Sequence, residues 1–283
     1  LGIKGAIFTL STGGEHMVYG PKGSFFGDNN DMALALNMVL PFLFYLMKNE
    51  ENRRLKTLLL WTFIMSIVSV VFTYSRGGFI TLAGVGAMLF LKSRHKILTA
   101  LIVMVILFGV ISYIPEQWVN RMETIKTYEE SQSAMGRIYA WYTAWNVAKD
   151  RPFVGSGFEG LRGSTRYRYS PQPDSTAGDV HSVYFEVLGE HGFVAFGLFI
   201  ALILFTLSTA QRLKGIARVS DNLKWVENYA NMFQISLLAY MIGGIFLGRA
   251  YFDLFYHIVA MVTVMKILIL SESKQSEATR NSH

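Results

Sequence analysis

The chain has 283 residues, of which 52% are hydrophobic and only 16% are charged, and its formal net charge is +6. A soluble domain carries about 25% charged residues, so this composition indicates a polytopic membrane protein, and the 14% aromatic residues exclude a disordered chain. The sequence has no cysteine, which excludes a disulfide scaffold, a thiolate zinc site and a cysteine nucleophile.

Seven apolar runs predict an all-α fold, a polytopic bundle of transmembrane helices. Two of the runs are short for a span, which needs about 17–25 residues, and Pro41 interrupts the first. Because the chain begins at Leu1 and no basic segment with a cleavage site follows, we expect a fragment or a trimmed chain with spans missing before it. The runs are residues 31–47, 57–74, 77–91, 97–114, 193–210, 230–248 and 253–270.

The lysines and arginines of the short connections orient the predicted spans. Four connecting segments fall on one side and hold 13 of the 26 lysines and arginines. Because cytoplasmic loops carry the excess of positive charge, this side is predicted to face the cytoplasm. The net charge is therefore a signal of topology rather than of a nucleic-acid partner. The basic segments are residues 48–56, 92–96, 211–229 and 271–283, and the short outside segments hold only Lys4, Lys22, Arg76 and Arg249.

This topology divides the chain into five predicted parts. A large periplasmic loop at residues 115–191 contains 8 Lys and Arg and 10 Asp and Glu. Long loops are functional or disordered, and helical patterns within this one favour function, so we expect it to be the catalytic loop. The other parts are a periplasmic stretch at 1–30, four spans at 31–114, three spans at 192–270 and a cytoplasmic tail at 271–283.

One helix is predicted from Arg137 to Lys149, where apolar residues recur at helical spacing. Trp141, Tyr142 and Trp145 give it an aromatic face that suits the membrane interface. We therefore expect this helix to lie near lipid.

A second loop helix is predicted from about Val180 to Glu190, with Asp179 as its N-cap. Residues 151–158 contain proline and two glycines and should end the first helix, and residues 159–179 are polar and predicted to form an exposed loop. Gly189 and Gly192 lie at the predicted turn into the fifth span.

Two outside arginines are candidate anion ligands. Arg76 is followed by Gly77 and Gly78 in a tight turn between two apolar runs, and a guanidinium matches phosphate with two parallel hydrogen bonds. The plainer alternative is an arginine that extends to the membrane surface. Arg249 is the second candidate, for which an ion pair with Asp253 four residues later is the simpler interpretation.

Arg137 and His181 are further candidates. Arg137 opens the first predicted loop helix, where the helix dipole disfavours a cation, so a second role or a surface pairing with Glu129 or Glu130 is needed to explain it. His181 lies at the start of the second helix, where the dipole should lower its pKa and favour a neutral imidazole that accepts a proton from a hydroxyl. A capping or core histidine is the alternative.

Other chemistry receives little support from the sequence. Glu186 and Glu190 lie one helical turn apart, which is more typical of a solvated helix face than of a glycosidase pair. The other histidines show no metal-ligand spacing with His181, so no metal site is expected. No Walker loop, zinc motif, nucleophile elbow or dinucleotide fingerprint occurs in the sequence.

Four short segments, in this order along the chain, resemble the O-antigen ligase and polymerase-like membrane glycosyltransferases. The resemblance covers about residues 60–270, and Ser182 stands where asparagine is common in the family. The start of the chain, at 4–9 and 27–31, resembles a subgroup of O-glycosylation ligases linked to exosortase systems. The four segments are FTYSRGGF at 72–79, GRIYAW at 136–141, PFVGSG at 152–157 and HSVYFEVLGEHG at 181–192.

The resemblance implies a metal-independent ligase without a cofactor, in the bacterial inner membrane. It implies that a glycan moves from undecaprenyl diphosphate to a hydroxyl of an acceptor glycolipid, such as the lipid A core, or of a protein. Arg76 and Arg137 would stabilise the departing diphosphate and His181 would activate the acceptor hydroxyl. The implied substrate-binding residues are Arg249, Trp141, Tyr142 and Trp145.

Three alternatives compete with this interpretation. A polymerase would use the same donor and add the glycan to another lipid-linked glycan, and the sequence does not separate it from a ligase. A transporter would place ionisable residues near the middle of its spans, whereas here the candidate polar groups gather on one face. A structural scaffold leaves the organised loop without a role.

Overall fold

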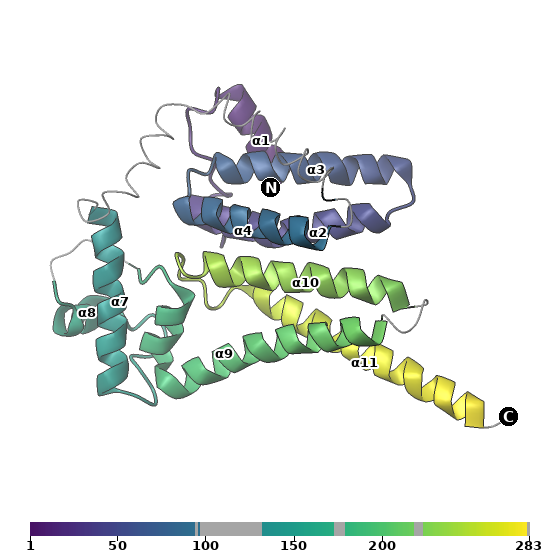
Figure 1. Cartoon of the computed structure of the whole chain (residues 1–283). Coiled ribbons are helices and arrows are strands. Elements are labelled where there is room, and N and C mark those ends of the chain that lie inside the picture. The colour runs from purple at the N-terminus through teal and green to yellow at the C-terminus, as the bar shows by residue number, and fades with distance from the viewer. Residues whose placement is uncertain (94–95, 97–131, 173–178, 218–222, 282–283) are drawn as a thin grey trace.

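The computed structural model describes residues 1–93, 96, 132–172, 179–217 and 223–281. The regular structure in these residues is α-helical (Figure 1), in agreement with the predicted fold class. The helices are α1 (Gly2–Ser11), α2 (Asn29–Asn49), α3 (Arg53–Val71), α4 (Arg76–Lys92), α7 (Gln132–Asp150), α8 (Gly163–Tyr169), α9 (Val183–Ala217), α10 (Lys224–Gly243) and α11 (Asp253–Asn281).

Four of these helices are long and apolar enough to cross a membrane: α2, α3, α9, and α11 as far as Ser271. The prediction of seven spans is therefore only partly supported. Helix α4, with 17 residues, is shorter than these four spans. Helix α10 is less apolar, and its polar residues find partners inside the bundle. Ser236 of α10, for example, donates a hydrogen bond of 2.6 Å to the carbonyl of Met38. The predicted span 97–114 lies outside the described residues.

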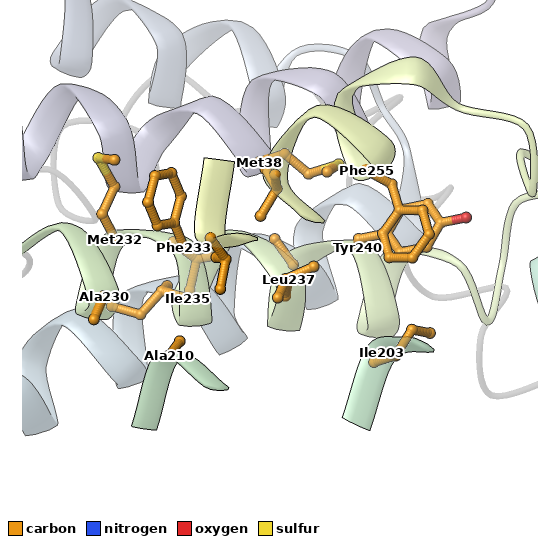
Figure 2. Packing of buried hydrophobic residues seen from close by; sticks show 14 of the residues in the cluster. Met38, Ile203, Ala210, Ala230, Met232, Phe233, Ile235, Leu237, Tyr240 and Phe255 are labelled. Carbon is orange, nitrogen blue, oxygen red and sulfur yellow. The ribbon is translucent and has the colours of Figure 1, made fainter. Parts of the chain in front are cut away.

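Helix α10 lies at the centre of the bundle, between the layer of α2 and α4 and the layer of α9 and α11 (Figure 1). Between apolar helices in lipid, close packing rather than water exclusion holds neighbours together. A Cβ atom on Gly243 would lie 2.6 Å from the Leu34 side chain, so α10 and α2 approach each other at this glycine. Figure 2 shows the buried cluster formed by Met38, Ile203, Ala210, Ala230, Met232, Phe233, Ile235, Leu237, Tyr240 and Phe255.

The turn before α4 is fixed by the first turns of α2. The Asn29 side chain donates a hydrogen bond of 2.7 Å to the carbonyl of Thr73. Ser75 caps α4, because its Oγ accepts the Gly78 N–H at 3.0 Å and itself donates to Asn30 Oδ1 at 2.7 Å. These bonds hold the N-terminus of α4 against α2.

Helices α7 and α8 cover one end of the bundle, with α7 running across the direction of the other helices (Figure 1). Helix α7 begins at Gln132, so the predicted start at Arg137 is wrong and Arg137 lies in the second turn. The predicted loop 159–179 contains α8, which is fastened to α7 by a hydrogen bond of 3.0 Å from the Asn146 side chain to the Tyr169 carbonyl. The prediction of an exposed loop over that whole stretch is therefore also wrong.

Helix α9 joins the second predicted loop helix to the fifth predicted span. The two parts meet at Gly192, whose φ of 78° produces a kink. The helix begins at Val183 rather than Val180, because His181 has a φ of 48°, which a right-handed helix does not include; Asp179 Oδ1 accepts the Val180 N–H at 2.8 Å. At the other terminus, α11 continues to Asn281, so the segment predicted as a tail is helical as far as it is described.

Candidate functional site

The candidate cations and the basic connections lie at opposite ends of the bundle. Arg76 begins α4, at the end where α7 lies, and the loop of residues 244–252 between α10 and α11 is at the same end (Figure 1). At the far end, Lys48 and Lys92 lie 3.5 and 2.9 Å from the side-chain oxygens of Asn228 and Asn231 on α10. The predicted separation of the two groups of cations is thus present along the helices.

Arg76 and Arg137 line one cavity of about 40 Å³, called here the arginine cavity. They come from α4 and α7, which are far apart in the sequence. Two features of the cavity favour an anion: the two guanidinium groups and the N-terminus of α4, whose dipole is positive at this end. Its remaining walls include Asn30, Ser75, Gly77, Gly78, Phe246 and Leu247.

The two glycines after Arg76 allow close packing around this cavity. A Cβ atom on Gly77 would lie 2.8 Å from the Cβ of Phe246, and one on Gly78 would lie 2.6 Å from the Cβ of Ala33. The first residues of α4 therefore approach both α2 and the loop of residues 244–252, which closes the cavity on two sides.

His181 lies two residues before the start of α9 in a left-handed backbone conformation, with a φ of 48°. Burial lowers the pKa of its imidazole, and the positive charge of Arg137 lowers the pKa further, so the ring is neutral near pH 7. Its Nδ1 atom is buried and accepts or donates no hydrogen bond among the described residues. The predicted direction of the shift is retained, but its cause is burial and a neighbouring cation rather than a helix dipole.

The loop of residues 244–252 packs directly on the segment that carries His181. A Cβ atom on Gly248 would lie 3.3 Å from His181 N, so this approach requires glycine or a small shift. The Val183 N–H donates to the Gly244 carbonyl at 2.8 Å, and the Ala250 N–H donates to Glu186 Oε2 at 2.8 Å. The loop is thereby fixed at three points against the start of α9.

A second cavity, of about 160 Å³, is lined in part by Arg249 and Tyr251 of the same loop and is called here the polar cavity. Glu186 and Glu190 both line it, so the expectation of a solvated helix face is wrong. Glu190 is only 4% exposed, and its carboxylate accepts a hydrogen bond from the Tyr251 hydroxyl. The cavity is further lined by Phe25, Glu159, Arg162, Arg166, Asp179, Val180, Arg249 and Tyr251.

Arg249 forms an ion pair with Asp31 of α2 rather than with Asp253. The two parallel contacts measure 2.7 and 2.5 Å, and the pairing raises the pKa of the guanidinium. The guanidinium also lies 5.0 Å from the centre of the Phe25 ring. Sequence reasoning missed Asp31. A carboxylate in the first turn of an apolar span is costly unless it is paired, so its presence could have indicated a partner.

Trp141, Tyr142 and Trp145 line a third cavity, of about 640 Å³, whose walls are mainly apolar. The Trp141 ring stacks on Phe185 of α9 with 5.3 Å between ring centres, and its Nε1 donates to the Val180 carbonyl at 2.9 Å. This apolar cavity therefore lies between α7 and α9, close to the segment before His181. Its other walls are Ile138, Tyr184, Phe185, Leu188 and Phe196.

In the part of the chain that the structure describes, no three or more His, Asp or Glu side chains are grouped so that they could hold a metal ion. The site is instead built from two arginines, a neutral histidine and the polar and apolar cavities around them.

Comparison with known proteins gives a family match for part of the chain. A family model described as O-Antigen ligase matches residues 61–200, the stretch that contains Arg76, Arg137 and His181. A comparison with curated proteins gives no match. The matched stretch, together with four helices able to cross a membrane, makes this a membrane protein whose residues 61–200 belong to the O-antigen ligase-like family.

Proposed function

We propose that the protein transfers a glycan from undecaprenyl diphosphate to a hydroxyl of an acceptor glycolipid or protein, at the periplasmic face of the bacterial inner membrane. The observation that carries the proposal is the shared arginine cavity lined by Arg76 and Arg137, together with the neutral His181, whose pKa the charge of Arg137 lowers. A lipid diphosphate has concentrated negative charge, and two guanidinium groups beside a helix N-terminus match it.

The proposed reaction uses each of these groups once. The acceptor hydroxyl attacks the anomeric carbon of the glycan while the bond from that carbon to the diphosphate oxygen breaks. The bonding electrons leave with the diphosphate, where Arg76 and Arg137 stabilise the developing charge. The hydroxyl proton passes to the imidazole of His181, whose buried Nδ1 has no hydrogen bond to lose.

The apolar cavity supports a lipid-linked donor. Trp141, Tyr142 and Trp145 line it beside α9, one of the helices able to cross a membrane. An isoprenoid chain could lie against these rings while its diphosphate reaches the arginine cavity. Because the basic connections lie at the far end of the bundle, the positive-inside rule supports a periplasmic position for this end.

Activity measurements on single variants test the proposal. Arg76→Ala, Arg137→Ala and His181→Ala are compared with the unchanged protein at equal expression, with mass spectrometry of the glycosylated products. Loss of transfer in all three is expected, and full transfer in all three would refute the site. A modified acceptor identifies a ligase, whereas a lengthened lipid-linked glycan identifies a polymerase with the same chemistry. Lipid translocation without transfer would instead indicate a transporter.

A further inference from the structure

We propose that the polar cavity is the subsite for one sugar ring of the acceptor, and that Glu190 and Tyr251 bind its hydroxyl groups. This inference deepens the proposed function, because it names the chemical class of the acceptor group that the site receives. It depends on the lining of the cavity, on its place beside His181, and on its charge.

The lining offers each kind of contact that a sugar ring makes. The carboxylates of Glu186 and Glu190 accept hydrogen bonds, and the guanidinium groups of Arg162 and Arg166 donate them. Tyr251 adds an aromatic ring for the apolar C–H face of a sugar. A cavity with acceptors, donors and an aromatic ring in about 160 Å³ suits a single ring rather than an extended chain.

Glu190 and Tyr251 are held in place before any ligand arrives. The Tyr251 hydroxyl donates to the Glu190 carboxylate and lies 2.6 Å from His191 Nε2. A carboxylate has about four lone-pair positions, so this bond leaves Glu190 able to accept from a sugar hydroxyl. Because Glu190 is only 4% exposed in the free protein, binding requires little further ordering of this side chain.

The polar cavity and the arginine cavity both border the loop of residues 244–252. Asp179 and Val180, just before His181, line the polar cavity, whereas Arg137 lines the arginine cavity. The loop shows the same alternation, because Leu247 lines the arginine cavity and Arg249 lines the polar cavity. A displacement at an anomeric carbon needs the attacking hydroxyl and the leaving group on different faces of the donor sugar, and two distinct cavities that border the same loop suit this requirement.

The charge of the lining selects among sugars. Four carboxylates line the cavity, while Arg249 is already neutralised by Asp31, which leaves two arginines against them. A neutral sugar should therefore be preferred over a uronic acid. The lining residues that set this balance are Glu159, Asp179, Glu186, Glu190, Arg162 and Arg166.

Binding of free sugars to the whole chain in lipid nanodiscs tests the subsite without requiring transfer. The probes are the methyl glycosides of N-acetylglucosamine and of glucuronic acid, followed by ligand-detected NMR. We expect the neutral glycoside to bind at least about tenfold more tightly than the acidic one, and Tyr251→Phe and Glu190→Gln each to weaken it by about fivefold or more. Arg162→Gln, at an exposed position where folding is not at risk, should weaken it as well.

Matched controls are Tyr19→Phe and Glu51→Gln, which make the same chemical changes at exposed positions outside the cavity. Failure of both glycosides to bind, preference for the acidic glycoside, or unchanged binding in Tyr251→Phe, Glu190→Gln and Arg162→Gln would each overturn the subsite. Glycan transfer with unchanged sugar binding in these variants would refute the subsite alone. Sugar binding that the variants weaken, in a protein that transfers no glycan, would refute the proposed function alone.

Discussion

Arg249 and Asp31 bind each other through two parallel contacts, Nε to Oδ1 at 2.7 Å and Nη2 to Oδ2 at 2.5 Å, across 218 positions of the chain. The Asp31 side chain is 2% exposed, whereas that of Arg249 is 32% exposed. The pair therefore ties the loop of residues 244–252 to the first turn of α2. Its geometry favours a role in holding the site together over direct binding of phosphate.

The first prediction concerns this ion pair. Arg249→Ala leaves a buried carboxylate without its partner, so it should lower the free energy of unfolding by about 3–5 kcal/mol. The double variant Asp31→Leu with Arg249→Met should lose less stability, because neither charge remains. Thermal unfolding in detergent measures both, with the exposed Arg54→Ala as the control. A double variant less stable than Arg249→Ala would contradict the prediction.

The second prediction separates charge from geometry in the arginine cavity. Arg76→Lys keeps the positive charge but loses the planar two-point contact with phosphate, so transfer should fall by about tenfold or more. In Arg76→Ala the rate of transfer should fall further, by about a hundredfold to a thousandfold. Initial rates at saturating donor measure both, and Arg53→Lys at the far end of the bundle is the matched control. If Arg76→Lys is as active as the unchanged protein, a bidentate role is wrong.

The third prediction concerns pH. In the proposed reaction the neutral imidazole of His181 accepts the proton, and burial together with Arg137 lowers its pKa below the ordinary value of about 6.5. Transfer should therefore stay constant as pH falls to about 6.5 and decline only below it. Arg137→Gln removes the nearby cation and should move this decline to higher pH, although the rate itself falls.

The same shift has a consequence for stability. Because the unfolded state binds a proton on this histidine at a higher pH than the folded state, stability is lost as pH falls through about 6.5. His181→Gln should remove that component of the pH dependence. A pH–rate profile of kcat/KM and unfolding at several pH values measure these effects, and an unshifted profile in Arg137→Gln would argue against the electrostatic coupling.

The fourth prediction concerns the apolar cavity. Trp145 is 42% exposed, so Trp145→Ala removes part of the cavity wall without opening the core. The KM for a donor with a long polyprenyl chain should rise by about tenfold, while kcat changes little, because the lost contact is made before and during reaction alike. A donor with a short chain should show almost no change. Equal effects on both donors would show that this cavity does not hold the chain.

The fifth prediction concerns the kink in α9. Alanine at Gly192 would place its Cβ against the Pro152 carbonyl and would need a left-handed backbone, so Gly192→Ala should cost about 1–3 kcal/mol or more. Gly197, in the same helix, has open space around its Cβ position, and Gly197→Ala should be neutral or stabilising by up to about 1 kcal/mol. Chemical unfolding measures the free energy of unfolding of both variants. Equal values for the two variants would show that the kink tolerates a side chain at residue 192.

Much of the local structure was predictable from the sequence. Apolar runs found the long helices, and helical spacing found α7, because both depend on residues close together in the chain. The predicted helix limits were less accurate. At residue 180 the sequence pattern continues, but His181 has a left-handed backbone conformation and α9 begins only at Val183.

The candidate site was only partly predictable, for a different reason. Arg76 was found because a glycine-rich turn marks it locally, and the structure adds that it shares a cavity with Arg137. Asp31 and Tyr251 were missed because their partners, Arg249 and Glu190, are distant in the sequence. A pairwise contact of this kind leaves no periodic pattern in one sequence.

The limits of the family match do not coincide with the limits of the site. The arginine cavity takes walls from Asn30 and Leu247, and the polar cavity takes walls from Phe25 and Tyr251, all of them outside residues 61–200. A protein cut down to the matched stretch would keep Arg76, Arg137 and His181 but open both cavities to their surroundings. Chimeras that exchange acceptor preference between relatives should therefore carry the loop of residues 244–252 together with the matched stretch.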